Sequence, residues 1–232
     1  FSGHGKHLDC PTLRLTNHHG LMIAGEAALS NWDAGMDMYI YGKLGNLIMT
    51  KEGINVLMTN LTGKVPPILQ RLDYIRFNGE AAGYLHDLTL TGLFHTGAGM
   101  VKTDVMMSID EQSMSRTYSG SVASADLDLG KLLNQEKKFG KVDFNVELKG
   151  FNYKNRYPES YIKGIISSFE YSQYQYENIM LDGVYKDGGF NGRLSMDDAN
   201  GSVQIDGNFN VAKTIPDFNL KASVKNLRPH DL

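Results

Sequence analysis

The sequence predicts an all-β protein built as one long antiparallel β-meander. The first observation behind this prediction is that apolar and polar residues alternate in many separate runs. The second is composition. The chain has 25 Gly but only 6 Pro among 232 residues, with 12 Tyr and 10 Phe, which suits many short strands joined by glycine turns. Side chains on a strand alternate between the two faces of the sheet, so each run has one apolar face and one solvated face. That pattern is typical of antiparallel sheets, whereas strands of all-parallel sheets are usually apolar on both faces.

The runs can be followed in chain order. Alternation is clear in VKTDVMMSID (101–110) and GKVDFNVELKG (140–150). Four more strands are expected at 177–185, 190–196, 202–211 and 217–226, and hairpin-length loops, KDGG (186–189) and DDANG (197–201), separate the first three of them. Asp, Asn and Gly tolerate the positive φ angles of tight hairpins, so neighbouring strands should pair in sequence. The whole chain, residues 1–232, should form one continuous system of about 12 to 16 strands.

Helical turns are expected at 65–74 and 127–138, but neither is long enough to cover a sheet. The apolar face of so many strands would therefore stay in contact with water, which is unfavourable at about 25 cal/mol per Å². The sheet must curl so that this face meets itself. A packed sandwich, a closed barrel and an open U-shaped trough (a β-taco) all satisfy this requirement, and periodicity does not choose between them.

The candidate site is the apolar face itself. Its members are the alternating apolar residues of the strands after residue 140, which would form the floor of a hydrophobic groove in a trough or the core of a closed sandwich. They are Val142, Phe144, Val146, Leu148, Ile179, Leu181, Leu194, Met196, Val203, Ile205, Phe209, Val211, Phe218, Leu220 and Val224.

Composition and motifs argue against other functions. The net charge of −3 provides no basic footprint for nucleic acid. His4, His7 and Cys10 lack the paired spacing of zinc ligands, and Asp197-Asp198 lies in a predicted turn, where Asp is common for backbone reasons. No nucleophile elbow or phosphate-binding loop occurs. We therefore expect no metal, no cofactor and no enzymatic activity.

Several long segments resemble one protein family. These are FGKVDFNVELKGF (139–151), YENIMLDGVYKDGGFNGRLSMDDANG (176–201), FNLKASVKNL (218–227) and, upstream, LQRLDYIRFNGEAAGYLHDLTLTGLF (69–94). They resemble the TamB family of translocation and assembly module proteins, which is AsmA-like, and in particular its large Bacteroidetes members. The likeness extends over most of the chain, although each element is also ordinary β-meander sequence.

The resemblance implies an open β-trough that crosses the periplasm in a protein anchored to the inner membrane by a segment outside this chain. Such a trough would carry phospholipid acyl chains toward the outer membrane and support outer-membrane biogenesis and protein assembly. Its outer-membrane partner, of the Omp85 class, would bind through other parts of the protein. The alternative is a structural or adhesive β module whose apolar face is packed shut. In either case, self-association through an edge strand is expected at FNLKASVKNL (218–227).

Overall fold

The structure is a computed structural model of the chain. It describes residues 2–110, 112–113, 115–152, 159–210, 216–226 and 228. The strands are β1 (Ser2–His4), β2 (His7–Thr16), β3 (Leu21–Ser30), β4 (Tyr39–Thr50), β5 (Tyr74–Tyr84), β6 (Asp87–Thr96), β7 (Gly99–Ile109), β8 (Arg116–Ala125), β9 (Leu127–Asp128), β10 (Phe139–Asn152), β11 (Glu159–Tyr171), β12 (Tyr174–Lys186), β13 (Gly189–Asp198), β14 (Gly201–Asn210) and β15 (Asp217–Lys225).

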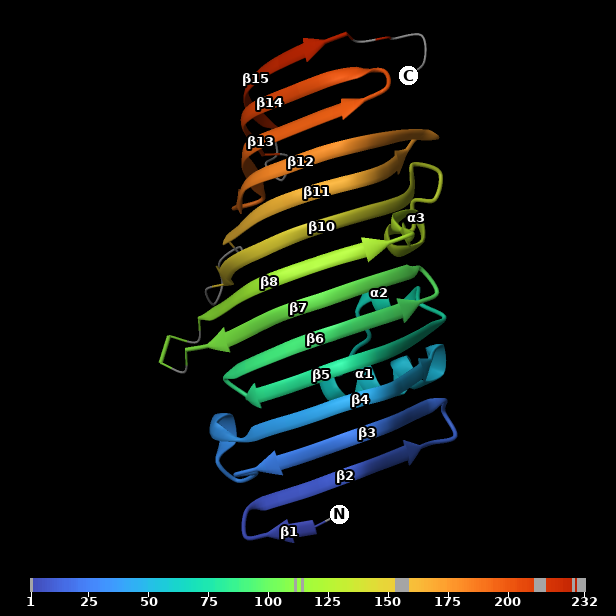
Figure 1. The fold of residues 1–232 in the computed structure, drawn as a ribbon, viewed down its shortest axis with the longest axis vertical. Coiled ribbons are helices and arrows are strands. Elements are labelled where there is room, and N and C mark those ends of the chain that lie inside the picture. Colours follow the sequence, from blue (N-terminus) through green and yellow to red (C-terminus); the bar gives the residue numbers. More distant parts are fainter. Residues whose placement is uncertain are drawn as a thin grey trace.

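These strands form a single 15-stranded antiparallel sheet in sequence order, with only the short β9 off the main path, where it pairs with β10. The two edges, β1 and β15, lie at opposite ends of the stack, so the sheet is not closed into a barrel (Figure 1). The predicted all-β meander and open trough are confirmed. The strands predicted after residue 140 are also confirmed, although Val211 lies outside the described residues.

The sheet is extended rather than folded into a compact sandwich. Its strands stack along the longest axis of the molecule (Figure 1), and thirteen successive spacings of about 4.8 Å would span about 60 Å. The solvent-accessible surface is 14849 Å². A compact monomer of the same mass, 25.8 kDa, would expose about 10,500 Å². One face of the sheet therefore remains largely uncovered by other strands.

Three α-helices lie together on the far side of the sheet as Figure 1 is drawn, and we call them the helical cap. They are α1 (Lys51–Thr62), α2 (Pro67–Gln70) and α3 (Leu129–Leu133), while a 3₁₀ turn, η1 (Gly35–Asp37), precedes β4. The predicted helical turns at 65–74 and 127–138 contain α2 and α3, but the longest helix, α1, was not predicted. No helix in the described part of the chain is long and apolar enough to cross a bilayer.

The main hydrophobic core lies between the helical cap and the middle strands of the sheet, from β5 to β10. Ile54 of α1 is 1% exposed and belongs to a buried cluster with Leu72, Ile75, Ala98, Leu127, Leu132 and Val142. Because Ile75 lies on β5 and Val142 on β10, the cap joins strands that are distant in the sheet. The cap thus buries part of the sheet that would otherwise be solvated, and it holds β5 and β10 together through one core.

Local sequence fixes the position of α1 at the sheet. Thr50 ends β4 and caps the helix, since its Oγ1 accepts a hydrogen bond from the Gly53 amide at 3.3 Å. The same hydroxyl donates to the His19 carbonyl at 3.0 Å in the turn between β2 and β3. At the other end, Gly63 adopts φ 75°, a left-handed conformation that favours glycine as a helix terminator. The helix therefore begins against the β2–β3 turn and ends at Gly63.

Candidate functional site

One face of the sheet, which we call the apolar face, carries continuous rows of uncharged residues. In an antiparallel sheet, residues paired directly across strands point to the same face, so the pairing register defines each row. The first row runs from β2 to β15 as Leu13, Gly25, Leu44, Gly79, Gly92, Thr103, Val122, Val146, Gly164, Leu181, Leu194, Ile205 and Ala222. No charged side chain interrupts it.

A second row runs beside the first, two residues along each strand, except on β2, where the register shift between Cys10 and Leu13 makes the step three residues. It consists of Cys10, Ala27, Gly42, Ala81, Leu90, Val105, Gly120, Leu148, Ile162, Gly183, Gly192, Gly207 and Leu220. A third row, two residues further on, contains Leu8, Leu29, Ile40, Gly83, Leu88, Met107, Tyr118, Gly150, Ser160, Tyr185, Phe190, Phe209 and Phe218. The three rows form an uncharged strip along the whole stack.

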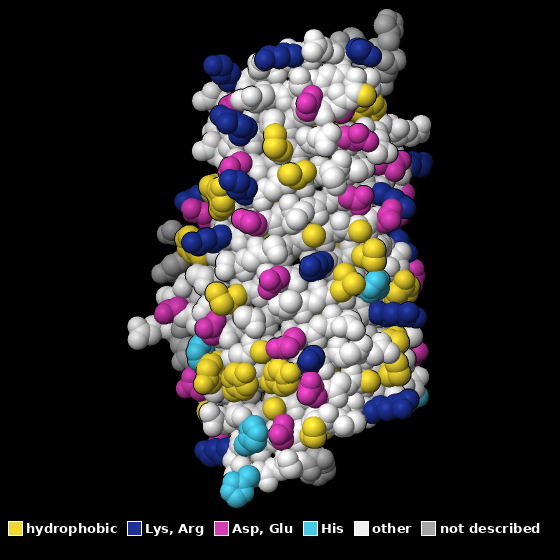
Figure 2. Space-filling model, in the orientation of Figure 1, with side chains coloured by type: hydrophobic (Ala, Val, Ile, Leu, Met, Phe, Trp, Pro, Cys, Tyr) yellow, Lys and Arg dark blue, Asp and Glu magenta, His cyan; other side chains and the backbone are white. Residues whose placement is uncertain are grey.

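The opposite face, which we call the charged face, has a row of alternating charge. We call it the charge ladder. In it every second residue is acidic, and the residues between are basic except for Thr91 and Ser121. It consists of Glu26, Lys43, Glu80, Thr91, Asp104, Ser121, Glu147, Lys163, Asp182, Arg193, Asp206 and Lys221. Arg193 Nε lies 2.6 Å from Asp206 Oδ1, and hydrogen bonds from Gln204 and Arg193 hold the pKa of Asp206 below its usual range. Figure 2 shows both signs of charge scattered over this face. The two faces therefore have opposite solvent preferences.

The predicted floor residues lie together on the apolar face. All those in the described part of the chain are brought to this face by the register, on β10, β12, β13, β14 and β15. Leu181, Leu194 and Ile205 are direct neighbours in the first row. Their exposure rises toward the last strand, where Phe218 is 59% exposed and Val224 is 51% exposed. The floor is thus most open at β15.

Two predicted floor residues are buried. Val142 is 4% exposed and belongs to the core under the helical cap, and Phe144 packs against that core. Ile179 is 8% exposed. These three positions lie on the predicted face, but Val142 and Ile179 do not offer an open surface to a ligand. The open part of the floor is therefore carried by the remaining described residues of β10 and β12 to β15.

Aromatic side chains border the aliphatic floor in the second half of the sheet. On one margin, Tyr185, Phe190, Phe209 and Phe218 follow one another across four strands, and the Phe190 and Phe209 ring centroids are 5.8 Å apart. The other margin carries Phe139, Phe169, Tyr171, Tyr174 and Tyr176, with the Tyr174 and Tyr176 centroids 4.6 Å apart. Phe209 and Phe218 of the first margin are among the predicted floor residues. The second margin was not predicted, although the repeated Tyr and Phe of SSFEYSQYQYE (167–177) offered a signal.

Some aromatic rings lie close against glycines of the floor. A Cβ atom on Gly79 or Gly92 would collide with the Phe77 ring, and one on Gly183 would collide with the Phe190 ring. Because glycine has no side chain, these rings can pack close to the backbone there. These rings cover glycine positions that would otherwise be weak points of the sheet.

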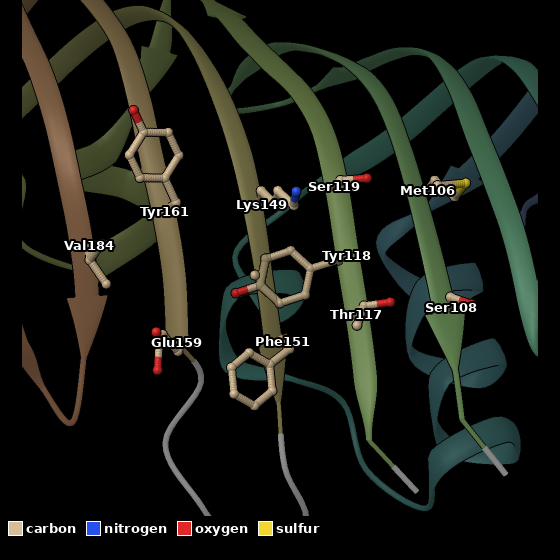
Figure 3. Close-up of a pocket in the computed structure, with 11 residues that line it drawn as sticks. Met106, Ser108, Thr117, Tyr118, Ser119, Lys149, Phe151, Glu159, Tyr161 and Val184 are labelled. Carbon is tan, nitrogen blue, oxygen red and sulfur yellow. The ribbon is translucent and has the colours of Figure 1, made fainter. Parts of the chain in front are cut away.

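A separate depression of about 520 Å³ lies mostly on the charged face, over β7 to β12 (Figure 3). Met106, Phe151, Tyr161 and Val184 provide its apolar lining. Figure 3 shows the Tyr118 ring reaching from β8 across β10, where it approaches Gly150. Polar contacts border the depression, since Glu159 pairs with Lys186 at 2.7 Å and the Tyr161 hydroxyl donates to Asp182 at 2.8 Å. The depression covers only β7 to β12, whereas the apolar face runs from β2 to β15.

The histidines take part in local contacts. His19 Nδ1 lies 2.7 Å from Glu52 Oε1, which connects the β2–β3 turn to α1, and His7 hydrogen-bonds to Ser30. Within the described residues, no three His, Cys, Asp or Glu side chains converge as metal ligands would. Asp197 and Asp198 were predicted in a turn, but they are the last two residues of β13, and only residues 199 and 200 turn the chain. Asp198 accepts hydrogen bonds from the Tyr174 hydroxyl and from the Asn200 amide, so its carboxylate braces the hairpin.

Comparison with known proteins gives no relative. No protein-family model, curated protein or solved structure matches this chain. The functional argument therefore depends on the two faces of the sheet.

Proposed function

We propose that this chain is a segment of a periplasmic TamB-like, AsmA-like protein whose hydrophobic groove carries phospholipid between the inner and outer membranes. In this proposal the protein is anchored to the inner membrane elsewhere and meets an Omp85-class partner through other parts. It would support outer-membrane biogenesis and protein assembly without catalysis. The observation that carries the proposal is the uncharged strip on the apolar face, which is continuous from β2 to β15.

The dimensions of this strip suit acyl chains. Neighbouring rows are two residues apart, which is about 7 Å along a strand, so three rows make a floor about 14 Å wide between the outer rows. Acyl chains lying along the stack would meet only apolar atoms and a few hydroxyl or thiol groups. Polar head groups could remain in water, because the sheet is open along its length. A floor of this kind needs no nucleophile, acid or base.

The aromatic margins fit the same function. Tyrosine favours sites where its ring is in an apolar environment and its hydroxyl reaches a polar one. Tyr174 meets this description, because its ring packs edge-to-face against Tyr176 while its hydroxyl contacts Asp198 and Asn200. Such residues could lie at the level of lipid glycerol groups, between the acyl chains and water.

The proposal is tested by lipid analysis of the purified chain. After expression in the periplasm of a diderm host, phospholipid should be recovered with the wild-type protein by mass spectrometry. Leu194→Asp and Val203→Asp place a charge on the half-buried floor, where an unpaired charge is unfavourable against acyl chains. Because the floor is open to solvent, both variants should remain folded and lose most of the bound lipid.

The matched control is Gln204→Asp. Gln204 neighbours Val203 in β14 but lies exposed on the charged face, so this variant should keep its lipid. Folded floor variants with wild-type lipid content would contradict the proposal. A lipid-free wild type whose floor variants unfold would instead favour a structural or adhesive β module with a closed apolar face.

A further inference from the structure

The depression on the charged face owes its shape to one strand of small residues. On this face β8 presents small side chains, which are Thr117, Ser119, Ser121 and Ala123. The neighbouring strands are taller beside them, since Ser119 lies between Met106 of β7 and Lys149 of β10. A row of small side chains between longer ones leaves a hollow, here of about 520 Å³ (Figure 3). Volumes of this size are typical of sites for small molecules.

The walls of the depression are largely apolar, although they stand on the charged face. Phe151 of β10 and Tyr161 of β11 are 40% and 41% exposed, and Met106 of β7 is 45% exposed. Val184 of β12 faces Tyr161 directly across strands. Side chains from four strands thus gather around the hollow and offer apolar contact to a ligand. Exposed apolar groups that line a concave surface are typical of ligand-binding sites.

One ammonium group lies within this apolar lining. Lys149 faces Ser119 on β8 and Tyr161 on β11, and neither residue is acidic. Figure 3 shows the Lys149 side chain reaching from β10 toward β8. The hydroxyls of Ser108, Thr117 and Ser119 also line the hollow, and they make no hydrogen bond within the described part of the chain. A cation and three unused hydroxyls therefore border the same space.

The carboxylates nearest to Lys149 are directed to other cations. Glu159 pairs with Lys186 at 2.7 Å. Glu147, two residues before Lys149 on β10, faces Lys163 directly across strands in the charge ladder. Opposite charges at facing positions of a sheet attract one another. Lys149 is thus the charge that remains uncompensated at the depression, and the complementary ligand is an anion.

The strands that carry the walls are held together by a contact on the apolar face. The Tyr118 side chain crosses β10 at Gly150, and its hydroxyl shares a hydrogen bond with the Ser160 hydroxyl on β11. Ser160 is 8% exposed, so water competes little for this bond. The bond joins β8 to β11 across the strand that carries Lys149 and Phe151. The backbone of the depression is therefore formed before a ligand arrives, which reduces the free-energy cost of binding.

We propose that this depression binds a small organic anion that combines one carboxylate with an apolar body. Lys149 and the Ser119 hydroxyl hold the carboxylate, because hydrogen bonds from an ammonium group to a carboxylate are stronger than neutral ones. Phe151, Tyr161 and Met106 contact the apolar body. The site lies on the opposite face from the floor, so it goes beyond lipid carriage and does not depend on it. Aromatic and aliphatic acids share this chemistry, and the test distinguishes them.

The experiment is calorimetric titration of the whole chain at low salt with two acids, 2-naphthoate and decanoate. Each acid is compared with its own amide, which keeps the apolar body and lacks the charge. At least one acid should bind about tenfold more tightly than its amide, because the charged hydrogen bond to Lys149 is lost with the carboxylate. A preference confined to naphthoate identifies an aromatic acid as the ligand, and one confined to decanoate identifies an aliphatic acid.

Protein variants then locate the site. Lys149→Gln changes an exposed side chain, so it should fold normally and remove the preference for acid over amide. Lys102→Gln is the matched control, because Lys102 is exposed on the same face of β7 but does not line the depression. Equal affinity of the wild type for acid and amide, or an unchanged preference in Lys149→Gln, would overturn the proposal. Binding that Leu194→Asp removes and Lys149→Gln leaves intact would place the anion on the floor and would also overturn it.

Discussion

Two isoleucines of different environment should respond very differently to truncation. Ile54 is 1% exposed beneath the helical cap, whereas Ile205 lies half-buried on the open floor. Replacing either by Ala removes three carbons, which corresponds to about 2.4 kcal/mol of transfer free energy when the side chain is fully buried. At Ile54 the resulting cavity should raise the loss of unfolding free energy to about 3–4 kcal/mol. At Ile205 water can fill the space, so the loss should be about 1 kcal/mol.

Urea denaturation of Ile54→Ala and Ile205→Ala, followed by circular dichroism, measures both losses. The comparison is valid if the two variants keep the wild-type dependence of unfolding free energy on urea. The expected difference between them is about 2 kcal/mol. Equal losses near 3–4 kcal/mol would show that Ile205 is packed as tightly as Ile54, and the description of the apolar face as an open floor would then be wrong.

Three further predictions concern shape, a turn and acid stability. Small-angle scattering of the monomer should give a radius of gyration clearly above the value of about 17 Å for a compact chain of this length, and a value of 17 Å would refute the extended sheet. Gly20→Ala should lower the melting temperature, because Gly20 has φ 80° and a Cβ there would overlap Thr50; Gly42→Ala, with open space at its Cβ, should not. Lys131, whose Nζ lies 2.6 Å from Asp73 Oδ2, holds the pKa of Asp73 below its usual range. That ion pair should contribute stability above about pH 4 and lose it as the pH falls through the lowered pKa, so Asp73→Asn should flatten the acid side of the melting-temperature profile.

Alternation along the chain predicts most of the fold for a clear physical reason. Each hairpin is local, so a run such as 190–196 and its neighbour at 202–211 determine their own pairing and the face of every side chain. For that reason the predicted floor residues in the described part of the chain fall on one face. Alternation does not give the bend of each strand, and it therefore could not distinguish an open trough from a closed sandwich.

The helical cap explains the main error. The segment KEGINVLMTNLT (51–62) follows a strand without a break and contains Gly53, so it was not predicted as a helix. Its capping residues were present in the sequence, with Thr50 before it and Gly63 after it, and they were the available signal. Because α1 covers strands far from it in sequence, the burial of Val142 could not be predicted from β10 alone.

Contact between lipid and the apolar face is most directly measured by site-specific photocrosslinking in the periplasm of a diderm host. A photoreactive phenylalanine analogue would replace Leu181 or Leu194 on the apolar face, and Met180 or Ser195 as their immediate neighbours on the charged face. Each variant is purified after irradiation, and covalently attached phospholipid is detected by mass spectrometry. Our account predicts phospholipid adducts at Leu181 and Leu194 and none at Met180 and Ser195. Equal labelling of both faces, or no lipid adduct at Leu181 and Leu194 in folded protein, would contradict it.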